Sequence, residues 1–110
     1  MIKARKHRYL LVVSFPQLDM LDKRNAMLML ASIRQFVGYA SYAFANPIVI
    51  KVFHDNMFVL RCNRGYEKQM ALALAFSRRI GDLSIAFCTI KTSGTIKTIK
   101  ELAGGISLKS

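Results

Sequence analysis

The pattern of apolar and polar positions along the chain predicts four β-strands. Each candidate is a run of apolar and β-branched residues bounded by turn-forming residues. The four runs cover residues 9–16, 48–54, 57–62 and 83–92. The first run stops at Pro16, and a short polar turn joins the second run to the third, as in a hairpin.

Apolar side chains that recur every three or four residues predict three helices. These helices cover residues 20–37, 65–80 and 95–103. Asp19 or Asp22 can cap the first helix, and Gly38 stands where a terminating glycine belongs. We expect residues 39–46 to form an irregular apolar connection, and the two glycines after Ala103 to end the last helix.

The predicted order is strand, helix, strand, strand, helix, strand, followed by a terminal helix. This is the order of the α+β ferredoxin-like fold, also called RRM-like, with a four-stranded antiparallel sheet and both main helices on one face. We expect a basic arm over residues 1–8, a single domain over residues 9–104 and a short tail over residues 105–110.

Strand alternation predicts a surplus of apolar side chains on the sheet face that the two main helices leave open. Arg61 and Lys51 mark this face, because a charged side chain avoids the core. An apolar patch of this size is usually covered, either by the terminal helix or by a partner protein. The residues predicted for this protein interface are Val49, Phe53, Met57 and Val59.

Composition adds a strong charge to this apolar framework. The 110 residues include 17 Lys and Arg against 6 Asp and Glu, a formal charge of +11, and 53% of the chain is hydrophobic. A basic folded domain attracts polyanions, so nucleic acid or an anionic membrane surface is the expected partner. The basic residues do not line one face of an amphipathic helix, which argues against membrane binding.

The two cysteines, Cys62 and Cys88, lie far apart and form no metal-binding motif. We therefore expect reduced thiols in a cytoplasmic protein and no metal site. His7 and His54 have no nucleophile or acid placed beside them by a recognisable motif, and the acidic residues are scattered. The sequence predicts no catalytic residues.

Three groups of residues are candidates for binding RNA phosphates. Arg61, Arg64 and Lys68 lie where the third strand meets the second helix, and clustered cations there can bind adjacent phosphates. The alternative is a solvated helix start. A helix N-terminus also binds phosphate well. The turn before the last helix therefore supplies the second group, Lys91, Ser93, Gly94, Thr95 and Lys97.

The alternative for that turn is an ordinary strand-to-helix connection with a capping hydroxyl. The third group is the arm, which can follow an RNA backbone or simply fray as a chain terminus. Its candidate residues are Arg5, Lys6 and Arg8.

Four landmarks in order along the chain resemble one known family. They are Arg8-Tyr9-Leu10, Ala45-Asn46-Pro47 before a strand with Lys51, VLRCNRGYEKQ at residues 59–69, and TSGTIK at residues 92–97. Together they resemble protein component 2 of archaeal and eukaryotic ribonuclease P, the Pop5 family, over roughly residues 7–100.

The resemblance implies a noncatalytic subunit that supports the RNA of ribonuclease P, which uses Mg²⁺ to cleave precursor tRNA at the mature 5′ end. It implies ribonuclease P RNA, precursor tRNA in the complex and ribonuclease P protein component 3 as partners, with possible self-association and no cofactor on this chain. The alternative is a stand-alone RNA-binding module of ribosomal or RNA-chaperone type.

Overall fold

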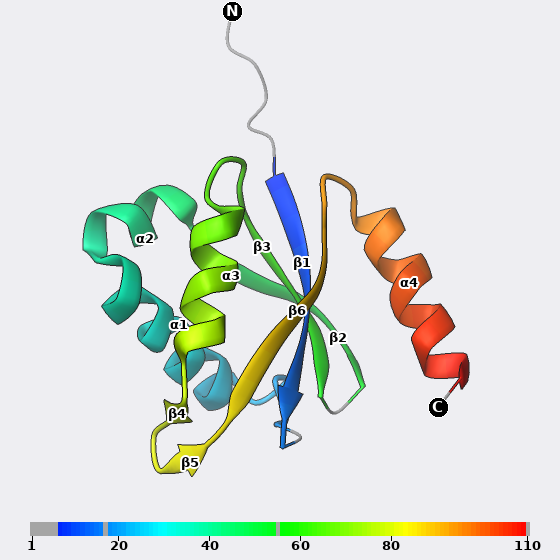
Figure 1. Ribbon diagram of the computed structural model, residues 1–110, viewed down its shortest axis with the longest axis horizontal. Helices are drawn as coiled ribbons and strands as arrows, with labels where there is room; N and C mark the ends of the chain where they lie inside the picture. The colour runs from blue at the N-terminus through cyan, green and yellow to red at the C-terminus, as the bar shows by residue number, and fades with distance from the viewer. Residues whose placement is uncertain (1–6, 17, 55, 110) are drawn as a thin grey trace, which may run out of the picture.

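The computed structural model describes residues 7–16, 18–54 and 56–109, and Figure 1 shows their arrangement. Helices α1–α3 lie on one side of a sheet and α4 lies on the other. The elements in chain order are β1 (His7–Phe15), α1 (Lys23–Val37), α2 (Tyr39–Ala45), β2 (Ile48–His54), β3 (Met57–Asn63), α3 (Glu67–Phe76), β4 (Arg79–Ile80), β5 (Leu83–Ser84), β6 (Ala86–Ser93) and α4 (Ile96–Lys109).

The four long strands form one antiparallel sheet in the order β2-β3-β1-β6. The ferredoxin-like prediction is confirmed. β1 is central, and Tyr9 lies opposite Arg61 of β3 and Ser93 of β6. Because β1 is antiparallel to both neighbours, its first residues lie between the last residues of β3 and β6.

The first helix begins and ends as its sequence predicts. The Asp22 carboxylate accepts a hydrogen bond from the Arg24 N–H at 3.0 Å, which caps α1. Gly38 ends the helix with a φ of 91°, a conformation that favours glycine. Since β1 begins at His7, two residues of the predicted arm belong to the sheet, and residues 1–6 lie outside the described part.

The prediction of an irregular connection after Gly38 was wrong. Residues 39–45 form α2, which closes at Asn46 in the left-handed conformation with a φ of 48°. Alanine occupies three of the seven positions and favours a helix. The Arg34 guanidinium also lies 5.4 Å from the Tyr39 ring centroid, which links α2 to α1.

The second main helix is shorter than predicted. It ends at Phe76, and Ser77 is extended. The chain then forms the β4–β5 ribbon, and the Ile85 N–H donates to the Arg78 carbonyl at 2.9 Å. This hydrogen bond extends the pairing of the ribbon by one step, and residues 79–84 form a separate two-stranded sheet with a turn between its strands.

The last helix is longer than predicted. α4 continues through the two glycines to Lys109, so most of the predicted tail is helical. Its contact with the sheet stabilises it, because Ile99 and Ala103 are completely buried. Packing of an apolar face outweighs the poor helix propensity of glycine here.

Two apolar clusters lie on opposite faces of the sheet. The larger one joins the sheet to α1 and α3 and contains Phe58 and Leu60. The Phe58 and Phe87 rings meet edge to face within it, with centroids 6.2 Å apart. The smaller one joins Met57, Val59 and Leu11 to α4. Alternation along β3 was therefore predicted correctly.

The sequence placed Val49 on the wrong face. Val49 pairs with Leu60 and packs in the larger cluster, on the side of α1 and α3. The register shifts between Val49 and Lys51, so Ile50 is an extra residue that breaks the strict alternation. Ile50 joins the smaller cluster in its place.

Helix α4 covers the remaining residues of the predicted protein interface. Met57 and Val59 are 4% and 0% exposed, and Phe53 is half-buried at the margin of the same cluster. Of the two possible covers for this sheet face, the chain supplies its own. A partner can reach Met57 and Val59 only if α4 moves.

Candidate RNA interface

A hollow of about 440 Å³ opens where β1 begins, β3 ends and β6 turns into α4. The antiparallel pairing of β1 with both neighbours brings these three segments together. The hollow therefore lies at one end of the sheet, between the start of β1 and the turns that follow β3 and β6. The residues that line it are His7, Arg8, Arg64, Gly94 and Thr95.

Gly94 makes room for the Arg8 side chain. A Cβ atom added to Gly94 would lie 2.8 Å from Nη1 of Arg8, closer than real Cβ atoms approach other heavy atoms. The missing side chain lets the guanidinium lie against the backbone of the β6–α4 turn. Arg8 is thus held beside the N-terminus of α4, where free N–H groups add partial positive charge.

Glu67 is the one acidic group recorded beside these cations in the described part of the chain. Its Oε2 lies 3.6 Å from Arg8 Nε, and its Oε1 accepts the Gly65 N–H at 2.7 Å. Burial raises the pKa of Glu67, but hydrogen bonds from the Gly65 and Glu67 N–H groups, and then the charges of Arg8 and Arg64, outweigh it and lower the pKa. The carboxylate stays ionised at neutral pH.

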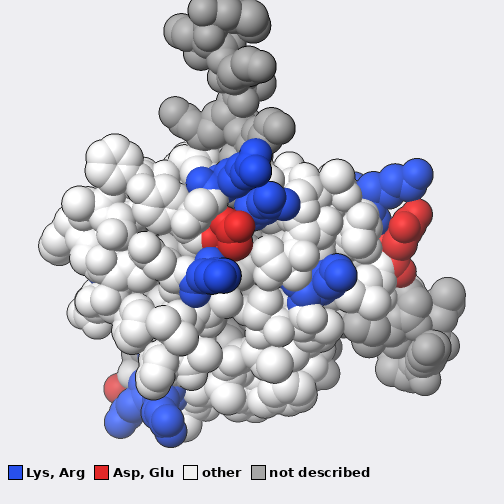
Figure 2. All heavy atoms as spheres, turned by 45° about the horizontal axis from the view of Figure 1, so that its top comes forward, with Lys and Arg blue, Asp and Glu red and all other residues white. Residues whose placement is uncertain are grey.

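Two guanidinium groups and one carboxylate leave the hollow with a net positive charge. Figure 2 shows this charge on the surface, where blue side chains surround a red one next to the grey N-terminal residues. Positive charge in a concave site raises the local concentration of anions, and arginine binds phosphate with paired hydrogen bonds. The hollow suits a phosphate of an RNA backbone.

The predicted cluster of Arg61, Arg64 and Lys68 is divided by the structure. Arg64 lines the hollow. Arg61 pairs with Tyr9, which packs on the α4 side of the sheet, and Lys68 is exposed in the first turn of α3. Only Arg64 therefore joins Arg8, which the sequence had assigned to the arm.

Two residues of the predicted turn, Gly94 and Thr95, line the hollow. Ser93 lies beside them and accepts a hydrogen bond from the Thr95 N–H at 3.2 Å. The Thr95 and Thr98 hydroxyl oxygens are 3.0 Å apart, so these hydroxyls stabilise the helix start. The capping hydroxyl of the alternative interpretation is therefore present, and the contact of this turn with RNA phosphate stays a prediction.

The other predicted cations do not line the hollow. Lys91 and Lys97 are exposed on β6 and α4. Arg5 and Lys6 lie outside the described residues. His7 does line the hollow, opposite Asn63 of β3, although no role was predicted for it. The antiparallel strand order was the signal that could have placed it there.

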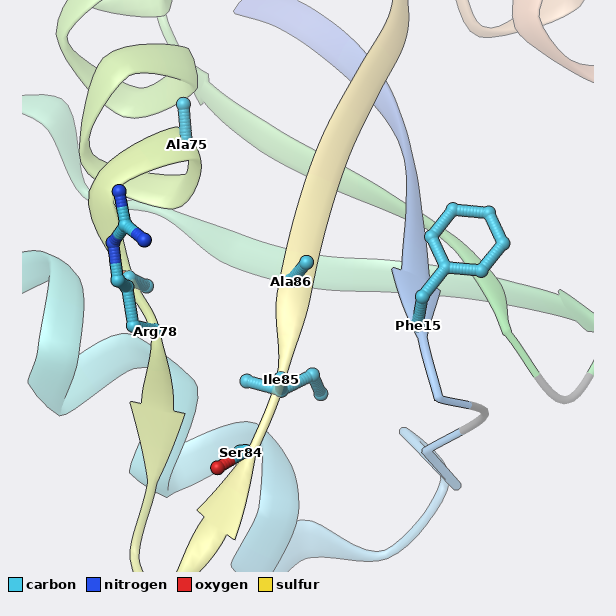
Figure 3. Close-up of a pocket in the computed structure, with 7 residues that line it drawn as sticks. Phe15, Ala75, Arg78, Ser84, Ile85 and Ala86 are labelled. Carbon is cyan, nitrogen blue, oxygen red and sulfur yellow. The ribbon is translucent and has the colours of Figure 1, made fainter.

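A second hollow, of about 540 Å³, lies between the end of α3 and the β1–β6 edge (Figure 3). Arg78 is its one charged lining residue, and Phe15, Ala75 and Ala86 make it mostly apolar. These residues do not form an acid–base pair. Elsewhere, burial and then the Glu67 charge raise the pKa of the Cys62 thiol to about 12, so this thiol is not a nucleophile at neutral pH.

Two further features bear on the class of protein. No described helix is both long enough and apolar enough to cross a membrane. Within residues 7–16, 18–54 and 56–109, no group of three His, Cys, Asp or Glu side chains is placed to hold a metal ion.

Comparison with known sequences decides the family. The profile of the Rpp14/Pop5 family matches residues 8–103, almost the whole described chain. The chain belongs to the Rpp14/Pop5 family. The resemblance found from the four sequence landmarks is thereby confirmed, and the match spans the hollow from Arg8 to Thr95.

Individual relatives of the Rpp14/Pop5 family agree with this assignment. Two proteins named Ribonuclease P protein component 2, from Methanoculleus marisnigri and Methanosphaerula palustris, are each 30% identical to this chain. The alignments cover 94% and 86% of this chain, and 69% and 59% of the relatives. A chain in the cryo-EM structure of yeast ribonuclease MRP has the same fold, with a TM-score of 0.65, 8% identity and full coverage of both chains.

Proposed function

We propose that this chain is a noncatalytic protein subunit of ribonuclease P, and that it binds the RNA of that enzyme through the hollow at the end of β1. Membership of the Rpp14/Pop5 family supports the subunit role. It favours this role over a stand-alone RNA-binding module. The observation that carries the RNA contact is the convergence of Arg8 and Arg64 on one hollow beside the N-terminus of α4.

The protein acts in this proposal by neutralising phosphates that the folded RNA brings close together. The Arg8 guanidinium lies beside the turn at Gly94, with Glu67 3.6 Å from its Nε, so its charge faces the hollow. Each neutralised phosphate releases condensed counterions, which makes binding strongest at low salt. The RNA carries out the cleavage of precursor tRNA with its own Mg²⁺.

The proposal includes ribonuclease P protein component 3 as a partner and allows for self-association of this chain. It places the protein in the cytoplasm, which suits the free thiols of Cys62 and Cys88. Lys91 and Lys97 stay candidates for a wider RNA contact, because they are exposed on the elements that flank the hollow.

Reconstitution of the enzyme tests the subunit role. Adding this chain and component 3 to the ribonuclease P RNA is expected to raise the rate of precursor tRNA cleavage at low Mg²⁺, because phosphate neutralisation replaces part of the Mg²⁺ requirement. Single-turnover cleavage assays measure this rate. An unchanged rate with correctly folded components would overturn the proposal.

Variants of the two arginines test the hollow itself. Replacing Arg8 and Arg64 by Gln is expected to reduce the slope of log affinity against log salt by about one unit per lost phosphate contact. The control replaces Lys51 and Arg79, exposed cations outside the hollow, and should leave the slope unchanged. Equal slopes for the two double variants would show that Arg8 and Arg64 do not contact RNA phosphates.

A further inference from the structure

The outer surface of the helical layer carries large exposed apolar side chains in two helical rows. The row on α1 runs from Arg24 through Leu28 and Ser32 to Phe36, at four-residue intervals. The row on α3 runs in the same way from Lys68 through Leu72 to Phe76. We call Leu28, Phe36, Leu72 and Phe76, which are 36%, 47%, 52% and 57% exposed, the helix-face patch.

The two rows run in opposite directions and meet at their phenylalanines. The Phe36 and Phe76 rings stack with centroids 5.5 Å apart and an interplanar angle of 12°. Going back along α1 from Phe36, Ser32 meets Ser77, and Leu28 lies 3.6 Å from the Cβ position of Gly81. Residue numbers fall along α1 from Phe36 to Leu28, while they rise along the neighbouring segment from Phe76 to Gly81. Arg24 and Lys68, which begin the two rows, therefore lie at opposite ends of the patch.

A hollow of about 230 Å³ lies beside the stacked rings, and its lining includes Phe36 and Phe76. The two serine hydroxyls in its lining already bond to one another, and the exposed Gln35 side chain lines it as well. The Ser77 hydroxyl donates to the Ala73 carbonyl at 2.9 Å, and the Ser32 hydroxyl lies 2.8 Å from Ser77 Oγ. Since Ser77 uses its only proton on Ala73, Ser32 donates to Ser77, and neither hydroxyl has a hydrogen left for a ligand.

The stacked rings and the two leucines, and not this small hollow with its serine and glutamine side chains, are the part of the patch that suits an apolar side chain. Recognition of a nucleobase needs hydrogen-bonding partners at its edges as well as an aromatic face, and the two serine hydroxyls beside the rings have no hydrogen left to donate. The remaining surface consists of Leu28 and Leu72, which do not stack with bases. An exposed aromatic pair surrounded by aliphatic side chains is typical of a protein–protein contact.

The charges around the patch define the partner further. α1 and α2 contain no acidic residue, and Glu67, the one acid on α3, already faces Arg8 and Arg64. The acids nearest the patch are Asp22, which caps α1 before Arg24, and Asp82, which follows Gly81 beside Leu28. Arg24 and Lys68 are exposed, and neither forms an ion pair in the part of the chain that the structure describes. A second copy of this chain, with its formal charge of +11, is disfavoured as the occupant of this patch relative to an acidic partner.

We propose that the helix-face patch docks an amphipathic helix of another protein subunit. Its apolar side chains cover Phe36 and Phe76, and its carboxylates meet Arg24 and Lys68. With a rise of about 1.5 Å per residue, the rows place these cations roughly 30 Å apart, so a helix of about 20 residues reaches both. The proposal rests on the role of the chain as a subunit of a larger enzyme.

Tryptophan fluorescence tests the occupant, because the chain contains no Trp. Phe76→Trp is titrated with ribonuclease P RNA alone, and is then measured in the holoenzyme reconstituted with all its protein subunits. We expect a blue shift and protection from acrylamide quenching in the holoenzyme and no change with RNA. A change with RNA alone, or no change in the holoenzyme, would overturn the proposal.

A matched pair of leucine variants tests the contact without disturbing the core. Leu72→Asp lies in the patch, and Leu21→Asp lies outside it at 75% exposure. Leu72→Asp is expected to weaken assembly with the other protein subunits at least about tenfold, and Leu21→Asp to leave it unchanged. Both should bind RNA like the unaltered chain, so equal assembly by both variants refutes the patch while the RNA-binding proposal stands.

Discussion

The two faces of the sheet are buried in different ways. Two main helices, α1 and α3, cover one face, and they are connected to the strands within the β-α-β-β-α-β order (Figure 1). A single helix, α4, covers the other face and is joined to it only at the end of β6. The first face is required for the fold itself. The second is sealed by one element that contributes no strand to the sheet.

The two cysteines lie on opposite faces of the sheet and differ in burial in the same way. Cys62 points toward α3 and is completely buried, whereas Cys88 is exposed on β6. Cys88 pairs with Val13, which belongs to the α4 side. α4 therefore covers the centre of its face and leaves part of β6 open.

The largest effect is expected on the face of α1 and α3. Phe58→Ala removes a fully buried ring that contacts Phe87, and should lower the free energy of unfolding by about 3–5 kcal/mol. Urea denaturation followed by circular dichroism measures this loss. A loss below about 1 kcal/mol would mean that this core can collapse around the cavity.

A smaller and more local effect is expected under α4. Ile99→Ala should cost about 2 kcal/mol, and should accelerate amide hydrogen exchange in α4 more than in β1 or β3. Lys100→Ala, at the exposed neighbouring position, is the control. Equal acceleration in all strands would show that the two faces unfold as one unit.

The smallest effect is expected from Glu67, the first residue of α3, which pairs with Arg8 of β1. Its lowered pKa means that the ionised form stabilises the fold above the pKa of the unfolded state, and that this contribution disappears as the pH falls through the folded pKa. Glu67→Gln should therefore cost about 0.5 kcal/mol at pH 7 and almost nothing at pH 3. Thermal denaturation at both pH values, with Glu101→Gln as control, measures it, and a cost that does not depend on pH contradicts it.

The sequence predicted the strands and the antiparallel sheet because their apolar runs are long and clearly bounded. It failed where tertiary contacts decide the local structure. α2 follows a glycine that normally ends a helix, and α4 continues through two glycines because Ile99 and Ala103 are buried against the sheet. The extra residue at Ile50 moved Val49 to the other face, and no local pattern marks that bulge.

The candidate site was predicted in pieces. Arg8, Arg64 and Gly94 were each identified, but they were placed in three separate groups, because spacing along the chain does not show which strand ends meet. Once β1 is known to be central, its first residues must lie next to the ends of β3 and β6. Lys68 was grouped with Arg64 by sequence distance, whereas the helix directs it elsewhere.

The opposite directions of α1 and α3 give the helix-face patch an approximate two-fold pseudosymmetry. Starting from either end, a docked helix meets a cation, then a leucine, then the stacked rings. The order of chemical groups alone therefore does not tell such a helix which way to point. Its polarity must depend on the unequal spacing of the two rows, since Ser32 adds one turn on α1 that α3 lacks.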